Sequence, residues 1–117
     1  MIAHVVLFRP RHGLDGDALE GVFAAIERAH REIEVVRRIL VGKLTLRGAS
    51  YAAAMEELPF AALIEFEDLP ALQAYLAHPA HQDLGRRFWE TSDAALAYDF
   101  EFFDASEARA ALSQILP

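Results

Sequence analysis

The sequence predicts an α+β domain with a four-stranded antiparallel sheet and helices on one face of it. Its 117 residues suffice for one domain with one core. Short apolar runs rich in β-branched residues alternate with longer segments in which apolar residues recur at helical spacing. Their order along the chain is β-α-β-β-α-β, which is the ferredoxin-like arrangement. An extra helix is expected at the C-terminus.

The first strand and the first helix have clear boundaries. "IAHVVLFR" (2–9) is stopped by Pro10, and both of its faces are mostly apolar, so both are expected to be covered. Residues 14–33 are expected to form a helix with Asp15 as its N-cap. Its apolar stripe comprises Leu19, Val22, Phe23, Ile26 and Ile33.

Two strands follow, separated by a loop. Residues 34–48 read as a long strand in which Gly42 marks a bulge or a bend. Residues 48–58 show no clear period and are expected to form a loop with a helical turn. Residues 60–67 form the next strand, with one apolar face that comprises Phe60, Ala62, Ile64 and Phe66.

A broken helix is expected after this strand. Asp68 is its N-cap, and an apolar stripe comprises Leu69, Leu72 and Leu76. Pro79 cannot continue a helix but can start a new one, which is expected to run to about Thr91. In this second part the inward stripe comprises His81, Leu84, Gly85 and Phe88.

The last strand is expected at 94–103 and a short amphipathic helix at 106–116. Asp99 and Glu101 alternate along the strand and are expected to mark its solvated face, although "YDF" at 98–100 also fits Asp99 at a sheet edge. The helix has one apolar side, which comprises Ala108, Ala111, Leu112 and Ile115. We therefore divide the chain into a ferredoxin-like domain, residues 1–103, and a C-terminal helical extension, residues 104–117.

The amino-acid composition restricts the kinds of partner that the protein can bind. A formal net charge of −7 argues against nucleic acids and anionic membranes, both of which need a basic footprint. There is no cysteine, which fits a cytoplasmic protein, and neither a signal peptide nor a membrane span is expected. Hydrophobic residues make up 54% of the chain, an excess for so small a domain. Because helices cover one face of the sheet, the other is expected to pack against a second copy, as a homodimer.

The histidines are the candidates for chemistry. His81 is expected to point inward, toward Tyr75 on the preceding helical segment and His4 in the first strand. Such a polar cluster in an apolar cavity is typical of a proton-transfer site and equally of a structural hydrogen-bond lock. His78 is expected near the N-cap of the second helical segment, and Pro79 separates it from His81, so no metal site is expected. Neither a phosphate-binding loop nor a nucleophile elbow occurs.

Four stretches carry a resemblance to a known family: "HVVLFR", "FEDLPALQAYLAHPAHQDL", "FW" and "YDFE". Over residues 2–103 the chain resembles the stress-responsive A/B barrel (Dabb) family. The resemblance implies a ferredoxin-like protomer and a homodimer whose two sheets form a barrel, the dimeric α+β barrel. Most members of the family have no established activity, and its best-understood branch is a plant polyketide cyclase that performs an intramolecular aldol reaction.

That branch implies roles for several residues. Tyr75 and His81 match its acid-base pair and His4 matches a pocket histidine, whereas Phe60 stands where the branch has a further pocket histidine. The expected pocket comprises His4, Phe60, His78, Phe88 and Trp89 beside the acid-base pair. Two functions follow: a homodimer of the family without an activity, or a cyclase- or lyase-type enzyme for an apolar carbonyl-containing small molecule. No cofactor is expected for either.

Overall fold

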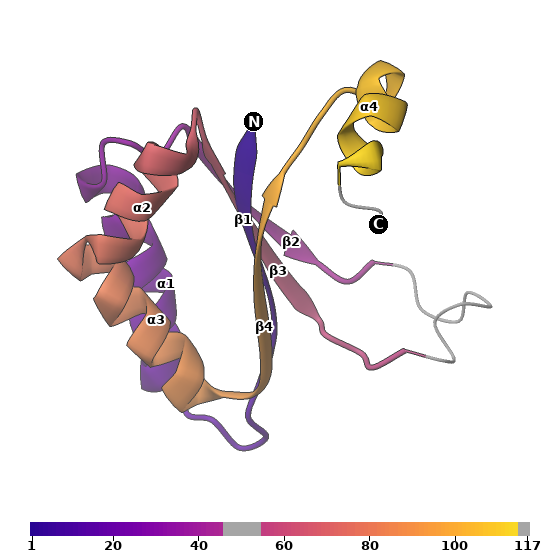
Figure 1. Cartoon of the computed structure of the whole chain (residues 1–117). Coiled ribbons are helices and arrows are strands. Elements are labelled where there is room, and N and C mark those ends of the chain that lie inside the picture. Colours follow the sequence, from indigo (N-terminus) through magenta and orange to yellow (C-terminus); the bar gives the residue numbers. More distant parts are fainter. Residues whose placement is uncertain (46–54, 115–117) are drawn as a thin grey trace.

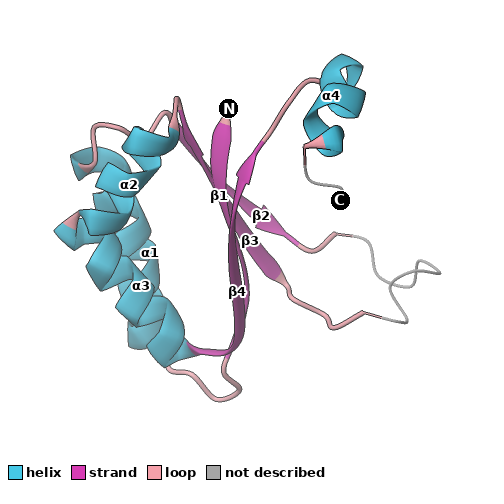
Figure 2. Ribbon diagram, in the orientation of Figure 1, coloured by secondary structure: helices cyan, strands magenta, loops and turns pink. Residues whose placement is uncertain are grey.

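The computed structural model describes residues 1–45 and 55–114. A helical layer covers one face of a single sheet, and the opposite face is open (Figures 1 and 2). The strands are β1 (Ile2–Pro10), β2 (Arg38–Lys43), β3 (Phe60–Phe66) and β4 (Ser92–Glu101). The helices are α1 (Gly16–Glu32), α2 (Leu69–Ala77), α3 (Pro79–Thr91), the short 3-10 turn η2 (Ala105–Glu107) and α4 (Ala108–Ser113).

The sheet confirms the predicted fold class. Its strand order is β2-β3-β1-β4 with antiparallel pairing throughout, so β1 lies in the middle and β2 and β4 are the edges. This is the ferredoxin-like α+β fold. The register places His4 of β1 opposite Ile64 of β3 on one side and Asp99 of β4 on the other. Paired residues share a face of the sheet, so all three point toward the helices.

The helix boundaries follow from local hydrogen bonds. Asp15 caps α1 by accepting from the Ala18 amide at 2.7 Å, and Asp68 caps α2 by accepting from the Ala71 amide at 3.0 Å. Pro79 opens α3, and the preceding His78 caps it through Nδ1, which accepts from the Ala80 amide at 3.0 Å. The predicted break between α2 and α3 is therefore present, and it changes the direction of the chain just before His81.

Several element predictions were wrong in detail. The strand expected at 34–48 is shorter, because β2 begins at Arg38, and its pairing with β3 continues without a bulge at Gly42. Phe23 is 43% exposed, and Ala25 and Ala29 occupy the buried stripe of α1 in its place. Leu69, expected on the inner stripe of α2, is also exposed. The predicted helical turn within 48–58 falls largely on 46–54, outside the described residues.

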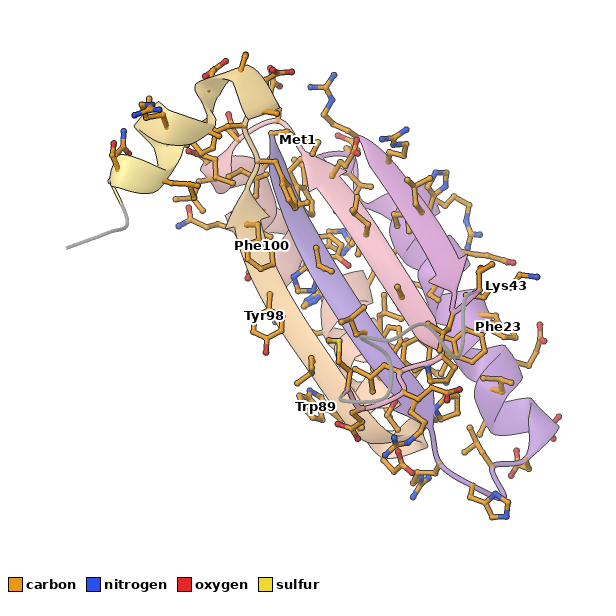
Figure 3. The ribbon with its side chains drawn as sticks, turned by 90° about the vertical axis from the view of Figure 1, so that its right-hand side faces the viewer. Met1, Phe23, Lys43, Trp89, Tyr98 and Phe100 are labelled. Carbon is orange, nitrogen blue, oxygen red and sulfur yellow. The ribbon has the colours of Figure 1, made fainter. Side chains whose placement is uncertain are left out.

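Asp99 and Glu101 are exposed, as predicted, and β4 is an edge strand, but these two residues do not lie on the open face of the sheet. Asp99 and Glu101 lie on the helix side of the sheet, opposite His4 and Ile2. Leu96, Tyr98 and Phe100 lie on the open face, where each is more than two-fifths exposed. Figure 3 views this face and shows Tyr98 and Phe100 along the edge strand. We call this surface the outer face; its apolar residues also include Val5, Leu7, Leu40 and Leu63.

The C-terminal helix is shorter than predicted and does not join the core. It spans Ala108–Ser113 rather than 106–116, and Ile115 lies outside the described residues. None of its residues is buried, and it stands apart from the sheet on the side opposite α1, α2 and α3 (Figure 1). In the described part of the chain, no helix combines the length and the apolar character that a membrane span requires.

Candidate active site

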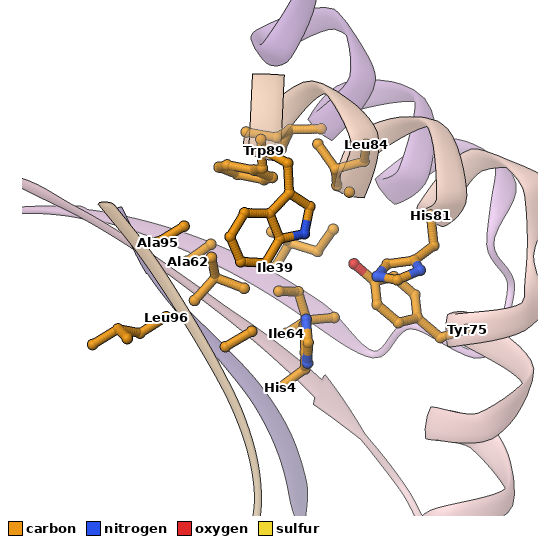
Figure 4. Close-up of a pocket in the computed structure, with 15 residues that line it drawn as sticks. His4, Ile39, Ala62, Ile64, Tyr75, His81, Leu84, Trp89, Ala95 and Leu96 are labelled. Carbon is orange, nitrogen blue, oxygen red and sulfur yellow. The ribbon is translucent and has the colours of Figure 1, made fainter. Parts of the chain in front are cut away.

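A pocket of about 190 Å³ lies between the sheet and α3 (Figure 4). Its walls are almost entirely apolar. The sheet contributes residues from all four strands, and α1, α2 and α3 contribute the opposite wall. The lining residues are His4, Val6, Ile26, Ile39, Ala62, Ile64, Tyr75, His81, Leu84, Gly85, Phe88, Trp89, Ala95, Leu96 and Ala97.

Three polar side chains meet in this apolar space. The ring centroids of Tyr75 and His81 are 4.5 Å apart, and each lies 5.9 Å from the ring of His4. Tyr75 comes from α2, His81 from α3 and His4 from the central strand. The predicted cluster of these three residues is therefore present, and the break at Pro79 brings two of them together from consecutive helices.

The hydrogen bond of His81 fixes which of its nitrogens can react. Nδ1 lies 3.1 Å from the carbonyl oxygen of Leu76. Because a carbonyl only accepts, Nδ1 carries the proton and Nε2 keeps its lone pair in the neutral ring. The pKa of His81 lies below 6.5, chiefly because burial disfavours the charged ring. Nearby His4 lowers the pKa further, whereas the Leu76 hydrogen bond and the charge of Asp99 raise it without reversing the effect of burial. The ring is therefore neutral at pH 7 and able to accept a proton at Nε2.

Tyr75 is the buried acid of the cluster. Its side chain is 1% exposed, and burial together with the negative charge of Asp99 raises its pKa to about 12. Figure 4 shows its hydroxyl directed into the pocket. Among the described residues the hydroxyl has no hydrogen-bond partner, and its ring packs against His81 and Phe66. A neutral phenol without a partner is ready to donate a hydrogen bond to a ligand.

Asp99 is a site residue that sequence reasoning missed. One of its carboxylate oxygens lies 2.6 Å from Nδ1 of His4, which donates to it. This bond fixes the tautomer of His4 and leaves its Nε2 unprotonated in the neutral ring. The polar alternation of β4 predicts a solvated face, and the same alternation also fits an acidic side chain paired across strands with a buried histidine.

Of the other residues expected in the pocket, two lie in its lining and two do not. Phe88 packs its ring against Phe8 at 4.6 Å, and Trp89 is 70% exposed at the rim. Phe60 stacks on Phe8 at 5.4 Å and lies outside the lining, because it stands near the end of β3 remote from Tyr75. His78 is also outside, since its ring is occupied in capping α3.

The family follows from comparison with known proteins. The sequence pattern of the Stress Responsive A/B Barrel Domain matches residues 2–102. The chain belongs to this Dabb family. No curated protein matches the chain.

Solved structures share the fold of this Dabb domain. A protein of Arabidopsis thaliana superposes with a TM-score of 0.74 at 21% identity, over 90% of this chain and 98% of that one. A dimeric protein of unknown function from Bacteroides fragilis gives 0.61 at 28% identity, over 86% and 95%. A hydroxynitrile lyase from Passiflora edulis gives 0.75 at 10% identity, over 89% and 94%, which shows the shared fold alone.

Small residues keep the Dabb pocket open. Ala62, Ala95 and Ala97 line it from the sheet, and Gly85 lines it from α3. A Cβ added at Gly85 would have no heavy atom within 4 Å, so no neighbouring side chain occupies that space. Gly85 lies one helical turn after His81, which places this empty volume directly beside the imidazole.

The residues of the site support acid-base chemistry. Within residues 1–45 and 55–114, no group of three or more histidine or acidic side chains is arranged to hold a metal ion. The polar groups that face the pocket are the imidazoles of His4 and His81, of which that of His81 is neutral, and the phenol of Tyr75. Such a set can remove a proton from a carbon acid and donate a hydrogen bond to the oxygen that gains the charge.

Proposed function

We propose that this Dabb protein is a homodimer in which each protomer binds a small apolar carbonyl compound and catalyses cyclase- or lyase-type chemistry on it. His81 is the base and Tyr75 the acid. The observation that carries the proposal is that one group offers a free proton acceptor and the other a free hydrogen-bond donor in the same pocket. Nδ1 of His81 is engaged by Leu76, which leaves Nε2 as the acceptor, while the Tyr75 hydroxyl is an unused donor in the same pocket.

In the proposed step, Nε2 of His81 takes a proton from the carbon next to a carbonyl group. The electron pair of the broken C–H bond moves to the carbonyl oxygen, which Tyr75 stabilises by donating a hydrogen bond. The resulting enolate carbon then attacks a second carbonyl of the same molecule, and the alkoxide formed there takes the proton held on Nε2 of His81, which restores the neutral imidazole. The apolar walls strengthen these interactions because they exclude water.

His4 assists in this proposal without being the base. Its Nδ1–H is held by Asp99, so the ring has a fixed orientation beside His81 and Tyr75. The negative charge of Asp99 raises the pKa of both His81 and Tyr75. Asp99 therefore favours the protonated forms of both groups, while His4 itself lowers the pKa of His81.

The dimer part of the proposal rests on the outer face. Aromatic and aliphatic side chains cover it, and among the described residues no helix packs on it (Figure 3). Face-to-face packing of two such sheets would remove this surface from water. The Bacteroides fragilis protein and a ferredoxin-like protein of Thermobifida fusca are both described as dimeric. The absence of cysteine supports a cytoplasmic location for this dimer.

The catalytic part is tested by proton exchange, which does not require the final product to be known. Small ketones and 1,3-diketones with apolar tails are incubated with the protein in D₂O, and deuterium at the carbon next to the carbonyl is followed by NMR. We expect the wild type to accelerate exchange for part of this panel. His81→Gln should slow it about 100-fold or more. His12→Gln, the same change in an exposed loop, is the control and should have no effect.

Two results would contradict the catalytic proposal. One is exchange at the uncatalysed rate for every compound, together with no change in the fluorescence of Trp89, the single tryptophan at the rim of the pocket. The other is exchange that is accelerated equally by wild type and His81→Gln. Light scattering tests the dimer separately: wild type should give twice the 13.0 kDa chain mass and Phe100→Glu the chain mass itself.

A further inference from the structure

We propose that the C-terminal arm, residues 102–114, packs against a second copy of this chain and extends the dimer contact beyond the sheet. The arm lies almost wholly outside the family match, which ends at residue 102. The inference rests on the face-to-face dimer proposed above, and it assigns a role to a segment that the pocket and the sheet do not use.

The arm carries a helix that its own protomer does not bury. α4 has six residues, and helices of this length are unstable alone in water because nucleation costs more than so few hydrogen bonds return. Leu112 is 55% exposed, and the other residues of the expected apolar side that are described, Ala108 and Ala111, are not buried either. A helix this short, with an apolar side, needs a surface to pack on.

An aromatic row connects the arm to the outer face. The ring centroids of Tyr98 and Phe100 are 6.0 Å apart, and those of Phe100 and Phe102 are 5.8 Å apart. Phe102 and the next residue, Phe103, are 43% and 48% exposed. The apolar surface that would face a second sheet therefore continues without interruption from β4 into the arm.

Local hydrogen bonds, rather than packing, set the direction of the arm. Phe102 pairs with Met1 in both directions: its amide donates to the Met1 carbonyl at 2.7 Å, and the Met1 amino group donates to its carbonyl at 3.3 Å. Asp104 then accepts from the amide of Ser106 at 2.9 Å and from its hydroxyl at 2.7 Å, which starts η2. The arm is thus anchored at the sheet and turned by its own residues.

The position of the arm points to a second copy as its partner. α4 lies on the outer-face side of the sheet, away from α1, α2 and α3 (Figures 1 and 2). A second sheet packed on the outer face would lie about 10 Å away, on the same side as α4. The partner protomer is therefore the surface that reaches the arm in the proposed dimer.

The test compares two charge insertions on opposite sides of α4. Leu112→Glu places a carboxylate on the apolar side, and Ala110→Glu places the same charge about half a turn away, on the exposed side. Dimer dissociation constants are measured by sedimentation. We expect Leu112→Glu to raise the constant about tenfold or more, and Ala110→Glu to change it by less than about twofold. In mixed dimers of ¹³C-labelled and unlabelled chains, Leu112 methyl groups should show intermolecular contacts.

The outcomes separate this inference from the proposed function. If Phe100→Glu dissociates the dimer while Leu112→Glu and Ala110→Glu leave it as tight as wild type, the arm inference is wrong and the outer-face dimer stands. Leu112 contacts found only within its own chain also overturn the inference. A monomeric wild type overturns both the dimer and the arm, and the proton-exchange assay then still decides the catalytic proposal.

Discussion

Gly85→Ala tests whether the space beside His81 is empty. Gly85 lies in the middle of α3 and lines the pocket, and a Cβ built there meets no heavy atom within 4 Å. Glycine inside a helix costs about 1 kcal/mol relative to alanine. Because no contact opposes the new methyl group, almost all of that difference should appear as added stability. We therefore expect Gly85→Ala to be more stable by about 1 kcal/mol, or roughly 4 °C in melting temperature.

The same methyl group should weaken ligand binding, because it enters the volume that the ligand would occupy. Gly85→Leu should abolish binding altogether. The assay is urea unfolding followed by circular dichroism at one fixed protomer concentration, since a dimer unfolds in a concentration-dependent way. Ligand binding is followed on the same samples by the fluorescence of Trp89, which lies in the same pocket lining.

Gly21→Ala in α1 is the matched control. There an added Cβ would come within 2.7 Å of the Arg87 guanidinium, so the side chain of Arg87 has to move and part of the helix-propensity gain is lost. Gly21 does not line the pocket, and binding should be unchanged. A Gly85→Ala protein that is less stable than wild type would refute the reasoning, because it would show that the space is already filled.

Three further predictions concern the polar cluster. His81 should titrate below pH 6.5 in NMR spectra. Because its pKa is lowered in the folded state, its contribution to stability is complete above pH 6.5 and is lost as the pH falls toward the folded pKa. The His81→Phe variant should not show this loss of stability. Tyr75→Phe should leave the free energy of unfolding within about 0.5 kcal/mol of wild type, since the hydroxyl has no partner among the described residues. The same variant should slow proton exchange. A loss of about 1 kcal/mol in the free energy of unfolding would instead favour the structural hydrogen-bond lock. Asp99→Asn should lower the pKa of both His81 and Tyr75, as seen by NMR and by ultraviolet titration, and unchanged values would contradict the placement of Asp99.

The fold was predictable because its boundaries are local. Pro10, Asp15, Asp68 and Pro79 each act on neighbouring residues, and all four mark element ends in the structure. The errors lie where the outcome depends on distant packing. Phe23 has helical spacing for the core, but the smaller Ala25 and Ala29 occupy the side of α1 that is buried.

The site was predictable only in part. The spacing of His81 with Leu84 and Phe88 on one helix fixes its inward direction, and the structure places all three in the pocket lining. The pairing of His4 with Asp99 joins residues 95 positions apart and depends on the register of β1 and β4. The register decides that Asp99 stands opposite His4, and this register cannot be read from the sequence of one strand alone.

The register of β4 links the site to the outer face. Side chains alternate along a strand, so the placement that turns Tyr98 and Phe100 outward necessarily turns Asp99 toward His4. A slip of one residue would put the aromatic rings in the helical layer and the carboxylate on the outer face. Covering the outer face with a second sheet would penalise that slip, because it would bury the charge of Asp99 without a partner. The proposed dimer therefore stabilises the same register that holds His4 in place beside Tyr75 and His81.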